Sequence, residues 1–217
     1  MVDLTPEDAE SGIPRSRREA RRQSRRDAIL EVAGRFFLQH GYSGTTMSGI
    51  ALELGGSKGT LWSYYPSKEA LFGAVLDRAT SDFREQLTQS LSPDDPIAVA
   101  LAKFCTRFLS KLSRPESLAL HRLVVGEAAR FPEMGRIFYE RAPLKTQALL
   151  ADFLRRAGEQ GQIRCEDPLV AAQYLIALCT ARSQQQLVTG VVDKLPSERI
   201  KAEVGDAVAV FLRAFAA

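Results

Sequence analysis

The stretch of residues 45–72 constrains the fold most strongly, because its apolar spacing and turn residues predict two short helices joined by a tight turn. Thr45 or Thr46 can cap the first helix, and two glycines at 55–56 end it. Pro66 ends the second helix, since the residue before a proline leaves the α region. One face of the first helix has the i, i+3, i+4, i+7 spacing of a buried surface: Met47, Ile50, Ala51 and Leu54.

The outward face of the second predicted helix has the chemistry of a surface that enters a DNA groove. It has no aliphatic residue and consists of Gly59, Thr60, Ser63 and Tyr64. Glycine permits close approach, while hydroxyl groups and a phenol can bond to base edges or phosphates. Lys58 and Lys68 flank this face as charges that attract phosphate.

The same stretch resembles the DNA-binding motif of the TetR family of bacterial transcriptional repressors, in the form TTM..IA...G.SKGTLW.YYPSKEALF. By this resemblance, phosphate contacts fall to Thr45, Thr60, Tyr64 and Lys68, and the positions nearest the bases are Lys58, Gly59 and Thr60. Gly56 and Ser63 depart from the residues usual in the family. The complete set of predicted DNA-binding residues is Arg22, Arg25, Thr45, Thr46, Lys58, Gly59, Thr60, Ser63, Tyr64 and Lys68.

Two aromatic residues beside this face have alternative interpretations. Tyr65 is in register with Leu61, four residues earlier, and is therefore predicted to lie in the core. Trp62 fits a core position or an exposed one equally well.

The basic charge of the chain gathers next to this motif. Net charge is +3, but residues 11–78 carry eleven Lys or Arg against six Asp or Glu, whereas residues 1–10 carry four acids and no base. Seven arginines fall within residues 15–26, offset only by Glu19. We expect residues 1–23 to form a disordered basic arm that contacts the DNA backbone or an adjacent minor groove. The alternative is a solvated extension that acts only by long-range attraction.

Composition and cysteine usage exclude several classes of protein. The 217 residues are 45% hydrophobic and 25% charged, as in an ordinary globular protein. No apolar run approaches the roughly 18 residues of a membrane span, and no apolar signal segment follows the N-terminus. Three cysteines without a C-x-x-C pair and two histidines predict neither a metal site nor a cofactor. We expect a cytoplasmic protein with no membrane association.

Helical spacing continues through the rest of the chain and predicts an all-α fold. A helix from Ser24 is closed by Gly41, so residues 24–78 form a three-helix, helix-turn-helix head. A long helix capped by Ser67 leads into residues 79–217, the predicted effector-binding and dimerisation domain. There, Asp167 and Pro168 start a helix that is predicted to run to about Thr189.

The last two predicted helices have broad apolar faces that must be covered. In the TetR family the last two helices of each subunit form a four-helix dimer interface, so the resemblance implies a homodimer. A single helix-turn-helix reads too few bases, whereas a dimer reads two half-sites. The alternative is that both helices pack only within one subunit.

A carboxylate interrupts an apolar stripe in the middle of the chain, where Glu127 follows Leu120 and Val124 and precedes Phe131. It could be an acid in an effector pocket that selects cationic ligands. The alternatives are a salt bridge to Arg130 or Arg136, or a wet helix edge. The stretch LHRLVVGEAARFPEMGRIFYERAP also loosely resembles the effector domain of TetR regulators linked to drug-efflux pumps.

The sequence therefore predicts a ligand-responsive, homodimeric transcriptional repressor that binds an inverted-repeat operator and is released by a small apolar or cationic effector. The predicted effector-binding residues are Phe104, Phe108, His121, Glu127, Phe138, Tyr139 and Tyr174. An architectural DNA binder without an effector is a second hypothesis. An enzyme is not expected, because no phosphate loop, metal-ligand cluster or catalytic motif is present.

Overall fold

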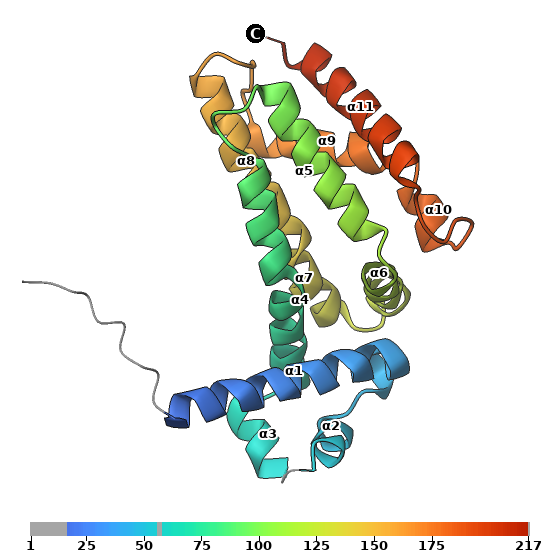
Figure 1. Cartoon of the computed structure of the whole chain (residues 1–217). Helices are drawn as coiled ribbons and strands as arrows, with labels where there is room; N and C mark the ends of the chain where they lie inside the picture. Colours follow the sequence, from blue (N-terminus) through green and yellow to red (C-terminus); the bar gives the residue numbers. More distant parts are fainter. Residues whose placement is uncertain (1–16, 56–57, 217) are drawn as a thin grey trace, which may run out of the picture.

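The computed structural model describes residues 17–55 and 58–216, and within these ranges every regular element is a helix. Three helices form a head at one end of the molecule: α1 (Arg17–Gly44), α2 (Met47–Glu53) and α3 (Lys58–Tyr64). The long α4 (Lys68–Ser90) rises from the head into an upper body of further helices, and the C-terminus lies at the far end of that body (Figure 1). The predicted all-α fold with an N-terminal head is confirmed.

The first helix begins earlier than the sequence pattern suggested. Residues 17–23, assigned above to a disordered arm, form the first turns of α1. Arginine, alanine and glutamine are good helix formers, and the Gln23 side-chain amide donates to Asp27 Oδ1 at 3.2 Å. The rest of the predicted arm, residues 1–16, lies outside the described residues. At the other end Gly41, with φ 73° and ψ 174°, interrupts the helical backbone where closure was predicted.

Side-chain caps fix the starts of three helices. The Thr46 hydroxyl accepts from the Gly49 N–H at 3.0 Å and begins α2. Ser67 accepts from the Ala70 N–H at 3.1 Å and begins α4. These bonds satisfy N–H groups that have no partner inside the helix. Both caps were predicted from the sequence, and so was that of Asp167 at the start of α9 (Pro168–Thr180).

The upper body contains α9 and six other helices, which are α5 (Ile97–Leu112), α6 (Pro115–Glu127), α7 (Pro132–Arg141), α8 (Pro143–Glu159), α10 (Gln184–Val188) and α11 (Ser197–Ala214). The helix predicted to run to about Thr189 ends at Thr180 instead, and the short α10 follows separately. The Thr180 hydroxyl donates to the Ile176 carbonyl at 2.9 Å. Such bonds to the preceding turn tend to bend a helix and so favour a break.

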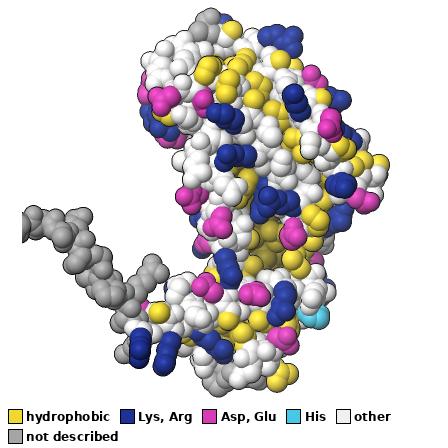
Figure 2. Space-filling model, viewed as in Figure 1, with side chains coloured by type: hydrophobic (Ala, Val, Ile, Leu, Met, Phe, Trp, Pro, Cys, Tyr) yellow, Lys and Arg dark blue, Asp and Glu magenta, His cyan; other side chains and the backbone are white. Residues whose placement is uncertain are grey.

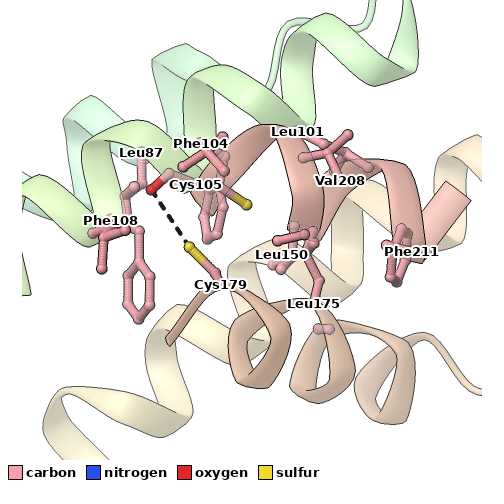
Figure 3. Packing of buried hydrophobic residues seen from close by; sticks show 14 of the residues in the cluster. Leu87, Leu101, Phe104, Cys105, Phe108, Leu150, Leu175, Cys179, Val208 and Phe211 are labelled. Atoms are coloured by element: carbon pink, nitrogen blue, oxygen red, sulfur yellow. Dashed lines mark hydrogen bonds between the residues drawn. The ribbon is translucent and has the colours of Figure 1, made fainter. Parts of the chain in front are cut away.

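A large apolar core holds the upper body together (Figure 3). The Cys179 thiol points toward the Cys105 carbonyl oxygen, 3.8 Å away, and both thiols are free. The hydrogen bond with Cys179 and burial raise the pKa of Cys105, so its thiol stays protonated. The labelled core residues are Leu87, Leu101, Phe104, Cys105, Phe108, Leu150, Leu175, Cys179, Val208 and Phe211.

The apolar core of the head extends across the predicted domain boundary. Its own helices supply Ile29, Phe37, Ile50 and Leu61, among others, and the start of α4 adds Phe72. The same buried cluster contains three residues of α6 and α7, namely Val124, Met134 and Ile137. The segment 24–78 therefore buries its core only together with residues of α6 and α7 that come more than forty residues later in the chain.

Charged side chains add a second connection along α4. Asp77 pairs with Arg141 of α7 and, at 3.1 Å, with Lys145 of α8. No helix in the described ranges is both long enough and apolar enough to cross a membrane.

Two leucine-to-alanine substitutions should separate core packing from surface exposure. Leu101→Ala removes a side chain with 0% exposure from the upper core, so it should lower the free energy of unfolding by about 2–5 kcal/mol. Leu52→Ala, at an 83% exposed position of α2, is the matched control. Urea unfolding followed by circular dichroism, at one fixed protein concentration, measures both, and equal effects would contradict this packing.

Candidate nucleic-acid interface

The α2–α3 unit has one buried side and one side that faces outward. Ile50, Ala51, Leu61 and Tyr65 are buried in the head. On the opposite side Gly59 and Ser63 are exposed, and Thr60 and Tyr64 are half-buried. The predicted reading residues of α3 therefore lie at or near the surface. Lys58 begins α3, and its side chain lies outside the described part of the structure.

Local bonds orient some of these groups. The Ser63 hydroxyl donates to the Thr60 carbonyl at 2.7 Å, so it is directed along its own helix. Trp62 is 40% exposed and lies on the surface of α3. Tyr65 is buried, as its register with Leu61 predicted, and its hydroxyl has no hydrogen-bond partner among the described residues.

The first half of α1 carries basic side chains beside this unit. Arg21, Arg22 and Arg26 are exposed and Arg25 is half-buried. Figure 2 shows Lys and Arg side chains gathered on the head near the start of the described chain. A basic surface of this kind on a helix-turn-helix head is the electrostatic footprint expected for contact with phosphates.

Thr45 departs from the role suggested by the resemblance. Its side chain is 1% exposed, and its hydroxyl donates to the Gly41 carbonyl at 2.7 Å. The hydroxyl therefore stabilises the turn between α1 and α2 and is not available to a phosphate in this arrangement. Its neighbour Thr46 is exposed and caps α2.

Lys68, a second predicted phosphate contact, lies against Tyr42. Its Nζ donates to the Tyr42 carbonyl at 2.8 Å and is 4.2 Å from the centre of the Tyr42 ring. The Tyr42 hydroxyl donates to Glu69 Oε1 at 3.0 Å. Burial, then the hydrogen bond to Glu69 and its negative charge, raises the pKa of Tyr42 well above its ordinary value. Tyr42 thus connects the end of α1 to the start of α4.

The predicted effector-binding residues do not converge on one place. Phe104 and Phe108 are buried in the upper core, with stacked rings 6.0 Å apart. Tyr139 is exposed on α7, and Tyr174 is 57% exposed on α9. These four side chains therefore do not line a common cavity with the others.

Two of the predicted residues do meet, at the waist of the molecule. The rings of His121 on α6 and Phe138 on α7 lie edge to face with centres 6.3 Å apart. Burial lowers the pKa of His121, so its ring is neutral at pH 7. Figure 2 shows a hydrophobic recess at the waist, between the upper body and the head.

Glu127 lies at a partly exposed edge of α6, which is one of the alternatives that the sequence left open, and its carboxylate also contacts the head. Its Oε1 accepts from the Tyr42 N–H at 2.9 Å, and its Oε2 accepts from the Ser43 N–H at 2.8 Å. Arg136 instead pairs with Glu133 and Glu140. Burial raises the pKa of Glu127, but the bonds from Ser43 and Tyr42 and the charge of Lys68 outweigh it, so the net pKa lies below its usual value. Glu127 is therefore a contact between α6 and the head.

Two residues important for this arrangement were not singled out from the sequence. Tyr42 is buried and bonded through its N–H, its carbonyl and its hydroxyl. A large aromatic residue directly after a helix-closing glycine was the available signal. Arg122 bonds to two carbonyls of α10, and no local pattern identifies that contact.

Comparison with known families decides the identity of this fold. A profile described as "Bacterial regulatory proteins, tetR family" matches residues 29–75. A second profile, "AefR-like transcriptional repressor, C-terminal domain", matches residues 99–217, more than half of the chain. The chain belongs to the TetR family of bacterial transcriptional regulators. TetR-family proteins are regulators that bind DNA through a helix-turn-helix, which confirms that the chain is not an enzyme.

Individual proteins are similar to this chain over most of their own length. A regulator from Mesorhizobium loti has 27% identity and a TM-score of 0.78, covering 89% of this chain and 98% of its own. The Flavonoid-responsive Regulator FrrA has 32% identity and a TM-score of 0.76, with coverages of 89% and 97%. The nucleoid occlusion factor SlmA of Pasteurella multocida is 27% identical over 163 residues, or 72% of this chain and 79% of SlmA.

Removing the cap of α2 should loosen the TetR-type reading unit. Thr46→Ala loses the bond to the Gly49 N–H, which should cost about 0.5–2 kcal/mol of stability and should weaken DNA binding. Thr46→Ser keeps a hydroxyl cap and should behave like the unsubstituted protein. Thermal unfolding and a DNA-binding titration of the two variants check this, and equal stability of both would show that the cap is unimportant.

Proposed function

We propose that this protein is a cytoplasmic, homodimeric repressor that binds an inverted-repeat operator and releases it when a small apolar or cationic effector binds. The observation that carries the proposal is the pairing of a helix-turn-helix head with an apolar outer face on α9 and α11. Predicted DNA contacts are those given above, with the Thr45 side chain reassigned to turn support.

The apolar outer face supports dimerisation. Tyr174 and Val170 of α9 and Val210 of α11 are exposed although they are large and apolar. A hollow between the two helices is lined almost entirely by apolar side chains: Tyr174, Ala177, Leu178, Ala181, Phe211, Ala214 and Phe215. Such a surface costs free energy in water and is typical of a subunit interface. Association through α9 and α11 would bury it and place two heads at a fixed separation.

Response to an effector is supported by the names of relatives and by the hydrophobic recess at the waist of the molecule. The C-terminal profile describes a transcriptional repressor, and FrrA is named as flavonoid-responsive. The hydrophobic recess at the waist (Figure 2) is the candidate effector site. An effector shifts the equilibrium only if it binds the non-operator conformer more tightly, so occupancy of this recess would have to move α6 or α7.

Selection of bound sequences from a random duplex DNA pool tests the proposal directly. At near-physiological salt, where unspecific charge attraction is reduced, we expect enrichment of an inverted repeat whose half-sites are related by the two-fold axis of a dimer. Enrichment of single half-sites would contradict dimeric reading. No enrichment from a folded dimer would favour the architectural DNA binder instead.

A charge placed on the apolar outer face should separate the subunits. Tyr174→Asp puts a carboxylate into the proposed interface, where its desolvation is costly, so it should shift the protein toward monomer. Val125→Asp, at a 62% exposed position of α6, is the control and should leave the dimer intact. Sedimentation equilibrium measures both, and a dimer that survives Tyr174→Asp would place the interface elsewhere.

A further inference from the structure

Helix α6 is bound in its middle to the segment that follows α9. Arg122 donates from Nε to the Val188 carbonyl at 2.8 Å and from Nη2 to the Leu187 carbonyl at 2.7 Å. These two residues are the last of α10. The last carbonyls of a helix lack partners within it and attract cations. Arg122 therefore connects α6 to α10, which lies in the chain between α9 and α11.

The C-terminal end of α6 is bound to the head. Glu127 is its last residue, and each of its two carboxylate oxygens accepts one N–H of the head, from Tyr42 and from Ser43. Two charge-assisted bonds to successive N–H groups fix the orientation of the carboxylate as well as its distance. A displacement of α6 cannot keep both bonds unless the head moves with it.

The Glu127 carboxylate stabilises the contact between α6 and the head, but it does not stabilise α6 itself. A negative charge at a helix C-terminus is unfavourable because the free carbonyls there are already negative. In the head, Gly41 adopts φ 73° and ψ 174°, a region that is essentially restricted to glycine. A Cβ atom at Gly41 would lie 2.5 Å from Glu127 Oε1, so the carboxylate occupies the space that the missing side chain leaves.

The contact continues from Tyr42 to the reading helix. Lys68 donates to the Tyr42 carbonyl and Glu69 accepts from its hydroxyl. Both residues lie in the first turn of α4, which follows α3 after three residues. The connection from α10 through α6 and Tyr42 to the end of α3 therefore consists of hydrogen bonds and short covalent links at every step.

We propose that Arg122 and Glu127 are positioning residues that hold α6 at two points and thereby set the angle between each head and the upper body. In a dimer this angle fixes the separation of the two reading helices, so the inference rests on the proposed dimeric function. An effector that displaces α6 would change operator affinity through Glu127. Coupling through these bonds is demonstrated only when a substitution at one end of the network changes a property at the other end.

The DNA test compares Glu127→Gln with the unsubstituted protein on the inverted repeat enriched from the random pool, on a single half-site, and on repeats with the spacer lengthened or shortened by one base pair. Glutamine has nearly the same size but sets a donor NH2 group against an N–H donor. We expect the affinity for the half-site to stay unchanged and the affinity for the preferred repeat to fall roughly tenfold. The affinities for repeats with different spacers should also differ less than in the unsubstituted protein. Glu116→Gln, the same substitution at the exposed start of α6, should change none of these.

A second measurement needs no DNA and so separates this inference from the proposed function. Arg122→Gln should speed hydrogen exchange of the Tyr42 and Ser43 amides, although Arg122 itself bonds to α10 and not to the head. The double variant with Glu127→Gln should exchange no faster than Glu127→Gln alone, because both substitutions act through one helix.

Three results would overturn the inference. Unchanged spacer preference in Glu127→Gln would show that the contact does not set head separation. Equal losses on the half-site and on the full repeat would show damage within the head. Unchanged amide exchange in Arg122→Gln would show that α6 does not transmit its position, whatever the DNA pool yields.

Discussion

The structure depends on an apolar contact that the head cannot complete by itself. Ile29 and Phe37 of the head and Phe72 of α4 are buried in one cluster, which Val124 of α6 and Met134 of α7 complete. Burying apolar area is the main favourable term in folding, so separating the head from α6 and α7 would expose much of its core. The orientation of the reading helix is for this reason part of the packing of the whole chain.

Local features were readable from the sequence because they depend on neighbouring residues. Thr46 and Ser67 cap their helices, and Gly41 ends the helical backbone of α1, each through contacts within a few residues. The burial of Tyr65 followed in the same way from its register with Leu61. The reading face of α3 was predictable for the same reason, although its contacts with DNA stay a prediction.

Contacts between distant segments were not readable, since periodicity shows which face of a helix is covered but not what covers it. Glu127 was among the predicted effector-binding residues, with a salt bridge or a wet helix edge as alternatives. The stripe of α6 that contains it and Val124 packs against the head. The partner of Glu127 lies 85 residues away in the chain. Phe104 and Phe108, which were predicted to bind effector, are buried in the upper core. Thr45 was assigned a role by resemblance, and its burial decided against it.

Gly41 and Glu127 share one small volume, since the carboxylate fills the place of an absent side chain. The two positions therefore cannot vary independently. Any side chain at 41 would expel the carboxylate, while a shorter residue at 127 would leave two backbone N–H groups of the head without acceptors. Position 41 is thus restricted twice, by its own backbone angles and by a carboxylate from a distant part of the chain.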